Sequence, residues 1–425
     1  MKFFPTLALS AAIGIAALSS GVQAQTPAAA VIKHYGDIAQ ATFEDSLSTA
    51  KALQVNIAAF LDKPTAATLA SAKKSWIAAR APYQQTEAYR FGNAIVDDWE
   101  GKVNAWPLDE GLIDYVASEY GTESDENPYY AANIIANPKL SIGGVEVDAS
   151  KITPALLSDT LQEIDEVESN VATGYHAIEF LLWGQDLNGT EKGAGNRAAT
   201  DYSLTDCTNG NCDRRRDYLS AATALLITDL EEMTANWQPA GAARVELAAK
   251  GDKGGLATIL TGMGSLSYGE LAGERIKLGL IVHDPEEEHD CFSDNTHFSH
   301  FYDAMSIKNV YTGEYKRVDG TVLKGPSLST LVAAAATGVD AKLTSELNQT
   351  EKYMQVMVDE AAKGNTFDVL IGSGNTAGNA VVQDVVDALT AQTKSIEAAI
   401  SALKLDDIEL EGSDSLDNPA SITAG

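Results

Sequence analysis

The sequence predicts an all-α protein made of two tandem helical bundles with a minor β-hairpin. Three observations carry this expectation. Apolar residues recur at helical spacing along most of the chain. A stretch dense in Gly, Asn, Thr and Asp, 184–213, separates two halves that hold similar numbers of long helices. The length of 425 residues suits two domains of ordinary size.

The expected helices follow one another with few interruptions. Thr65 is a typical N-cap for the second of them, which we expect to end at Gly92. Alternation around Asp319-Gly320, within 311–323, predicts the hairpin, and 121–154 reads as a long loop with room for another. The expected helices are 28–61, 65–91, a short one from 110, 156–164, 169–183, 214–237, 254–282, 327–336, 341–362 and 376–405.

The ends of the chain differ from the body. Residues 1–24 read as a signal peptide, because 6–19 is apolar and Val22-Gln23-Ala24 is a small-x-small cleavage signal. The alternative interpretation is an uncleaved membrane anchor, but the apolar run is shorter than the ~20 residues that a membrane-spanning helix needs. We therefore expect export to the periplasm or the outer-membrane surface. The predicted division is 25–200 for the first bundle, 201–410 for the second and 411–425 for a frayed acidic tail.

Composition excludes some classes of protein. Apolar residues make up 45% of the chain, enough for a core, so disorder is excluded as the main state. The formal net charge of −30 argues against a nucleic-acid partner, because phosphates would be repelled.

The chain has three cysteines, an odd number that allows at most one internal bridge. Cys207 and Cys212 flank a tight, turn-rich loop and are the easiest pair, and an exported protein permits a disulfide. Cys291 would then be free or buried. No CxxC knuckle is present, which excludes zinc-finger chemistry.

Two charged residues fall on the apolar face of the predicted helix 65–91. Arg80 and Glu87 continue the spacing of Leu69, Trp76 and Tyr83, which mark the core side. A buried charge is costly unless it is paired or coordinated. The two residues could form a buried Arg–Glu network, or Glu87 could be a functional carboxylate.

The predicted helix 169–183 is apolar nearly all round and should be buried. His176 and Glu179 interrupt it, three residues apart and hence on one face, and Gly174 permits a close approach. Helical bundles build metal sites from a carboxylate and a His at this spacing. A His hydrogen-bonded to Glu within the core is the alternative, because two ligands do not complete a site.

The other histidines are less specific. Four of them lie in or beside the acidic stretch 283–300, which also holds Asp294 and which we expect to be a solvated surface rather than a dedicated site. Before it, Glu270 and Glu274 share a predicted helix face with Ser267 and Lys277. No HExxH, GxSxG, P-loop or convincing dinucleotide-binding motif is present.

These residues carry a family resemblance. Gly174-Tyr-His176-Ala-Ile-Glu179 matches the GxHxxE motif of the imelysin family. Further stretches resemble that family in order, and the nearest likeness is to its iron-regulated protein A type. They are Trp76-x3-Arg80-x2-Tyr83-x3-Glu87, Asn104 to Glu110, Gly269 to Arg275 and Cys291 to Thr296.

The resemblance implies two helical domains related to four-helix bundles, with a site between them, and a link to bacterial iron uptake. It implies a metal site of His176, Glu179 and Glu87, with Arg80 as a further partner. Glu270, Glu274 and Asp294 are weaker candidates.

Two functions follow from the resemblance. One is binding of a metal ion or a small metal-containing ligand, with iron the expected metal, zinc or copper alternatives, and iron-transport components of the cell envelope as partners. The other is a metallopeptidase, because the family is named for a member reported to cleave insulin; Glu179 would then be catalytic. The usual two-His helix is missing, so binding is favoured.

Overall fold

The computed structural model describes residues 1, 27–122, 124, 127–142, 144–405 and 407–422. Apart from Met1, the predicted signal peptide lies outside these residues. The α-helices are α1 Pro27–Asp62, α2 Ala66–Gln84, α3 Ala94–Asn104, α4 Glu110–Ile113, α5 Pro154–Leu156, α6 Gly174–Trp183, α7 Cys212–Asn236, α8 Ala242–Ala249, α9 Gly251–Ser265, α10 Leu278–Val282, α11 Thr296–Thr312, α12 Leu328–Ala361, α13 Phe367–Ile371, α14 Thr376–Ala402, α15 Asp414–Asp417 and α16 Pro419–Ile422.

Short irregular helices and two antiparallel hairpins complete the fold. The π-helical segments are η3 Leu157–Leu161 and η6 Leu266–Lys277. The 3-10 segments are η1 Glu87–Tyr89, η2 Ser118–Tyr120, η4 Ile164–Glu166, η5 Ala199–Tyr202 and η7 Pro285–Glu287. The strands are β1 Lys139–Ile142 paired with β2 Val145–Asp148, and β3 Glu314–Lys316 paired with β4 Val322–Lys324. The predicted all-α class is confirmed, with a hairpin in each of the two places that had room for one.

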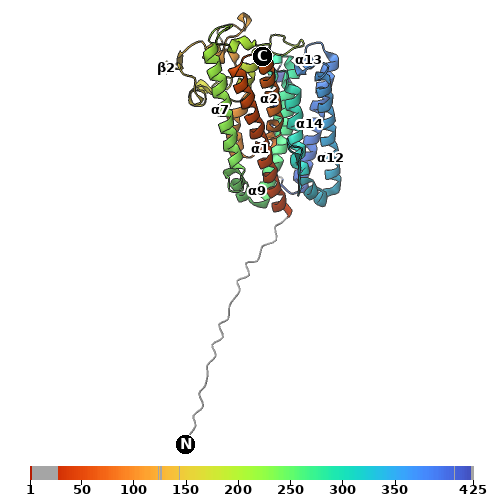
Figure 1. Ribbon diagram of the computed structural model, residues 1–425. Coiled ribbons are helices and arrows are strands. Elements are labelled where there is room, and N and C mark those ends of the chain that lie inside the picture. The colour runs from red at the N-terminus through yellow and green to blue at the C-terminus, as the bar shows by residue number, and fades with distance from the viewer. Residues whose placement is uncertain (2–26, 123, 125–126, 143, 406, 423–425) are drawn as a thin grey trace.

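The axes of the long helices are roughly aligned, and the helices pack side by side (Figure 1). Helix α1 packs on α2 and α7, and α12 packs on α14 and α11. Contacts of α2 with α11 and of α1 with α9 connect the helices of the first half of the chain to those of the second half. One hydrophobic cluster contains residues from Val31 to Leu405. The predicted domain boundary at 200 and 201 stays a prediction. None of the described helices combines the length and the apolar character needed to cross a membrane.

Helix α2 ends earlier than the sequence pattern indicates. Thr65 caps it as expected, through a capping box with Thr68. At the other end, Thr86 Oγ1 donates to Tyr83 O at 2.6 Å, and Thr86 N donates to the same oxygen at 2.7 Å. The main chain tightens there into η1, so Glu87 lies on a 3-10 turn and not on the face of α2 that carries Arg80.

The predicted helix 254–282 is interrupted by the π-helix η6. A π-helix closes hydrogen bonds from i to i+5 and has wider turns than an α-helix. Glu270 and Glu274 bond to different partners there: Glu270 accepts from Arg275 Nε at 2.8 Å, whereas Glu274 accepts from Ser413 Oγ at 2.6 Å.

The tail after residue 411 is docked on η6, where we expected a frayed end. Ser413 and Ser415 are buried. Gly269 and Gly273 allow the approach: a Cβ on Gly273 would lie 2.3 Å from Ser413 Cβ. The expected helices 327–336 and 341–362 also differ, forming the single helix α12 with a kink at Ala336.

The stretch 283–300 is not a solvated loop. Helix α11 begins within it at Thr296, so His297 and His300 are helical. Before the helix, Asp284 and Glu286 are exposed, but the segment is mostly buried from Glu288 on, with His289 and Asp290 at 1% and 0% exposure. Elsewhere the structure pairs Cys207 with Cys212, and Cys291 is a free, half-buried thiol.

Gly174 opens helix α6 and fixes where the helix begins. Its φ is +77°, a conformation that favours glycine. A Cβ at this position would lie 2.4 Å from Val103 O, so α6 begins in direct contact with α3. The glycine of GxHxxE is therefore needed to place His176 and Glu179.

We expect Gly174→Ala to lower the free energy of unfolding by at least about 2 kcal/mol, since strain and a backbone clash add. Urea denaturation measures this loss. Gly374→Ala is the matched control: its φ is +84°, but no described atom lies within 4 Å of the added Cβ. An equal, small loss in both variants would contradict the role of the contact with Val103.

Candidate metal-binding site

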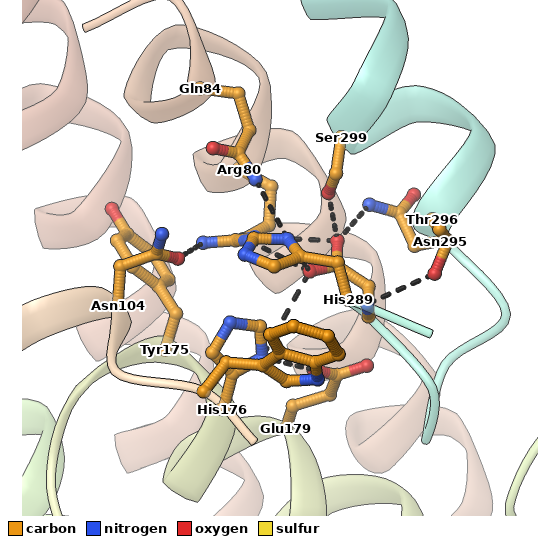
Figure 2. A network of polar contacts seen from close by, with 12 residues as sticks. Arg80, Gln84, Asn104, Tyr175, His176, Glu179, His289, Asn295, Thr296 and Ser299 are labelled. Carbon is orange, nitrogen blue, oxygen red and sulfur yellow. Dashed lines mark hydrogen bonds and ion pairs between the residues drawn. The ribbon is translucent and has the colours of Figure 1, made fainter. Parts of the chain in front are cut away.

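A buried polar cluster joins four segments of the fold (Figure 2). Helix α2 supplies Arg80 and Gln84, the end of α3 supplies Asn104, and α6 supplies His176 and Glu179. The segment between η7 and the first turns of α11 supplies His289, Asp290, Ser293, Asn295, Thr296 and Ser299.

An ion pair between Arg80 and Asp290 lies at the centre of this cluster. Arg80 Nη2 donates to Asp290 Oδ1 at 2.7 Å, and Nε donates to Oδ2 at 3.3 Å. The third guanidinium nitrogen, Nη1, donates to Asn104 Oδ1 at 2.6 Å. Asp290 Oδ2 also accepts from Asn295 Nδ2 at 2.7 Å and from Ser299 Oγ. Both charges are buried, and each is held by several hydrogen bonds, as burial requires.

His176 and Glu179 contact each other, as their spacing predicted. His176 Nδ1 lies 3.1 Å from Glu179 Oε2. The other oxygen of Glu179, Oε1, accepts from Ser293 N at 2.9 Å and from Ser293 Oγ at 2.7 Å. His176 Nε2 is buried and has no hydrogen-bond partner among the described residues.

His289 completes the cluster on the side of Arg80. Its ring lies against that of His176, with centroids 4.9 Å apart. Nδ1 of His289 lies 3.2 Å from Arg80 Nη2. Because a guanidinium has no acceptor, Nδ1 of His289 can take part in this contact only as the acceptor.

Burial and the charges of Arg80 and Asp290 set the protonation states. Burial lowers the pKa of His176 to about 3, and Arg80 adds to that effect. Burial and Arg275 hold the pKa of His289 well below its usual range. Burial alone would raise the pKa of Asp290, but Arg80 brings it well below the ordinary value. At neutral pH the cluster therefore holds two neutral imidazoles and an ionised carboxylate.

Glu179 differs from Asp290 although the two lie in one cluster. Burial, followed by the charge of Asp290, raises the pKa of Glu179 well above its usual range. Arg80 is bonded to Asp290 and not to Glu179, so only one of the two carboxylates receives full compensation.

Three of these residues could hold a metal ion together. One ligand atom each from His176, His289 and Asp290 lies within 4.8 Å of the others. Both imidazoles are neutral and the carboxylate is ionised, as metal ligands must be, and Nε2 of His176 has no hydrogen bond to give up among the described residues. The set fits a metal, although any ion would compete with Arg80 for Asp290 and, if it bound Nδ1 of His289, for that nitrogen as well.

The other predicted site residues lie in different clusters. Glu87 Oε2 accepts from Arg275 Nη2 at 2.8 Å, and Arg275 also binds Glu270 and Asp303. Glu270 pairs in addition with Arg90. The proposed ligand role of Glu87 stays a prediction, but the side chain is engaged by Arg275.

Sequence reasoning missed His289 and Asp290, which it placed on a surface. The only local signal was the neighbouring Cys291-Phe292, because Phe292 is a buried anchor at 3% exposure. The contact with Arg80 spans 210 residues and has no signature in the sequence.

The comparisons with known proteins agree with this architecture. A model of the imelysin family matches residues 39–396. The chain belongs to the imelysin family. Iron-regulated protein A of Synechococcus elongatus is 36% identical over 61 residues, which is 14% of this chain and 17% of that protein.

Two solved structures share the imelysin fold over nearly the whole chain. An iron-regulated protein A precursor from Parabacteroides distasonis has a TM-score of 0.65 at 18% identity, over 90% of this chain and 97% of that one. An imelysin-like protein from Psychrobacter arcticus has a TM-score of 0.56 at 16% identity, over 88% and 94%. At these identities the likeness shows the fold alone.

His300 allows a test of the protonation states in this imelysin family member. It is fully buried beside Phe367, neither ring nitrogen has a described partner, and burial lowers its pKa to about 3. The unfolded chain takes up a proton near pH 6.5 and the folded chain does not, so stability falls as the pH drops below 6.5.

We therefore expect His300→Phe to reduce the loss of unfolding free energy between pH 7.5 and pH 5 by about 2 kcal/mol. Urea titrations at the two pH values measure it. Phe298→Leu, on the same helix, changes no titrating group and should keep the wild-type dependence. An unchanged loss in His300→Phe would show that His300 is protonated in the folded protein.

Proposed function

We propose that this imelysin family member is an exported metal-binding protein of bacterial iron uptake, with its site at His176, His289 and Asp290. The observation that carries the proposal is the convergence of these three ligand atoms within 4.8 Å beside the unpartnered Nε2 of His176. Iron is suggested by the name of the relative, iron-regulated protein A.

The donor set is mixed. Two imidazoles and a carboxylate suit iron, and they would also take zinc or copper. In the tautomer in which His176 Nδ1 donates to Glu179, the lone pair of Nε2 is available to an ion. A carboxylate behind a ligating His fixes the tautomer and raises the basicity of the ring. Glu179 thus supports His176, and the positive charge of a bound ion favours its ionised form.

The ligands lie at 0% to 1% exposure, which favours a bare ion over a larger metal complex. An ion that enters must share Asp290 with Arg80, and the two cations repel each other. Uptake and release would therefore depend on how far the Arg80 guanidinium can move, with Asn104 as its remaining partner.

Export is the second part of the proposal. Its support is the signal-peptide pattern in 1–24 and the Cys207–Cys212 disulfide, which suits an oxidising compartment. The periplasm or the outer-membrane surface would then be the location, and iron-transport components of the envelope the partners.

Calorimetric titration with iron, zinc and copper salts tests the site. We expect wild type to bind iron and His176→Ala to bind it at least ~10-fold more weakly; Glu179→Gln should lose ~10–100-fold through the orientation of His176. His34→Ala removes a buried imidazole elsewhere, on α1, and should bind like wild type. Equal affinity in wild type and His176→Ala would refute the site.

The peptidase alternative needs a general base beside a metal-bound water. Both oxygens of Glu179 already have partners, and its raised pKa makes it a poor base at neutral pH. We expect no cleavage of unfolded substrates by the purified protein in a gel assay. Cleavage that stops with a chelator and with Glu179→Ala would establish the enzyme instead.

A further inference from the structure

A second group of carboxylates gathers outside the His176 cluster. Asp186 follows the end of α6, Asp294 precedes α11, and Asp368 lies on α13. One oxygen from each lies within 4.8 Å of the others. Three separate segments of the chain therefore bring acidic side chains to one point.

Two of these side chains are buried without partners. Asp368 is 1% exposed, and neither of its carboxylate oxygens has a hydrogen-bond partner among the described residues. Asp294 is 9% exposed, and its Oδ1 likewise has none. Asp186 Oδ1 accepts from Asn188 N and Nδ2, at 3.0 and 2.6 Å. A buried carboxylate with no donor is costly, so the group lacks a partner that the folded chain does not supply.

Several other buried acids are each paired with an arginine. Asp290 pairs with Arg80, Asp303 with Arg275, and Asp114 with two arginines, Arg197 and Arg215. Within the described residues, no Lys or Arg forms an ion pair with any of the three carboxylates of this group. More acid surrounds it: Glu110, Glu286 and Glu288 line an adjoining cavity of about 10 Å³ together with Asp186 and Asp368.

The mutual repulsion appears in the pKa values. Burial, with Asp368 and Asp186 adding, raises the pKa of Asp294 to about 8. Burial and Glu286 raise that of Glu110 to about 8. Without a cation, Asp294 and Glu110 therefore hold protons at neutral pH, and a bound cation would displace them.

We propose that Asp186, Asp294 and Asp368 form a second metal site, for a hard divalent cation of the size of Ca²⁺. A donor set made only of carboxylate oxygens selects Ca²⁺ or Mg²⁺ over the softer metals that imidazoles bind. The three oxygens lie within 4.8 Å of one another, close enough to bind one ion together. Ca²⁺ accepts several carboxylates in a flexible geometry, whereas Mg²⁺ usually keeps several waters and takes only one or two carboxylates, so three carboxylates favour Ca²⁺. A cavity of about 10 Å³ holds a water or a single ion and excludes an organic cation.

Such an ion would tie α13 to the end of α6 and the start of α11. It would also lie close to the first cluster without sharing its ligands. Glu288 connects the two: one oxygen accepts from Asp368 N, and the other accepts from Thr296 Oγ1 at 3.2 Å. Thr296 Oγ1 in turn accepts from Asp290 N at 3.0 Å.

The test is a calorimetric titration of the chelator-treated, folded protein with CaCl2, together with its melting temperature with and without 1 mM CaCl2. We expect wild type to bind one Ca²⁺ per chain and to melt at a higher temperature with Ca²⁺. Asp368→Asn should bind at least 10-fold more weakly and lose the shift. Asp206→Asn changes an exposed acid and should behave like wild type.

Asp186→Asn provides a second test if Asp368→Asn fails to fold. Asp186 is only half-buried, so its substitution should disturb the fold less. No heat and no shift with wild type would overturn the proposal, as would wild-type Ca²⁺ affinity in Asp186→Asn and in any folded Asp368→Asn. Tighter binding of MgCl2 than of CaCl2 would overturn the choice of ion.

This site does not rest on the proposed iron function, and the variants separate the two. His176→Ala should keep the Ca²⁺ response, and Asp186→Asn should keep iron binding. If His176→Ala abolished the Ca²⁺ response, the ion would belong to the first cluster and the second site would be refuted.

Discussion

The buried ion pair between Arg80 and Asp290 determines the chemistry of the whole polar centre. Arg80 holds Asp290 ionised, and the positive charge of Arg80 helps to keep His176 neutral. In its contact with His289 the guanidinium can only donate. Removing one partner of such a pair costs about 3–5 kcal/mol, since the other is left as a buried bare charge. The same pair joins α2 to the segment before α11.

The fold surrounds this pair with rigid supports. Trp76 Nε1 donates to Tyr175 O at 2.9 Å, which fixes α2 against the first turn of α6. Asn104 takes one arm of Arg80 and donates to Glu100 at 2.8 Å. Arg275 gathers Glu87, Glu270 and Asp303 in a neighbouring cluster. In both clusters one guanidinium bonds several oxygen acceptors at once, which a Lys ammonium could not do with fixed geometry.

The sequence allowed much of the fold, and part of the site, to be predicted. Periodicity located α1 within two residues at each end, and spacing placed His176 beside Glu179, because both are local properties. The position of Glu87 was predicted wrongly, because α2 ends before that residue, where Thr86 bonds back to Tyr83 O. The π-helix η6 and the docked tail were missed because each depends on packing between distant segments. For the same reason the acidic stretch before α11 read as solvent-exposed, since its counter-charge lies on α2.

The sequence separation of 210 residues between Arg80 and Asp290 has a consequence for biosynthesis. A chain made from its N-terminus exposes Arg80 long before Asp290 exists, and the arginine must stay hydrated until then. The interior around α2 and α6 can close only when the segment before α11 arrives. A chain that terminates before residue 290 would leave Arg80 unpaired and the centre of the fold open to water. Such a chain would be readily cleaved by proteases. The polar centre therefore forms only in chains whose synthesis has passed residue 290.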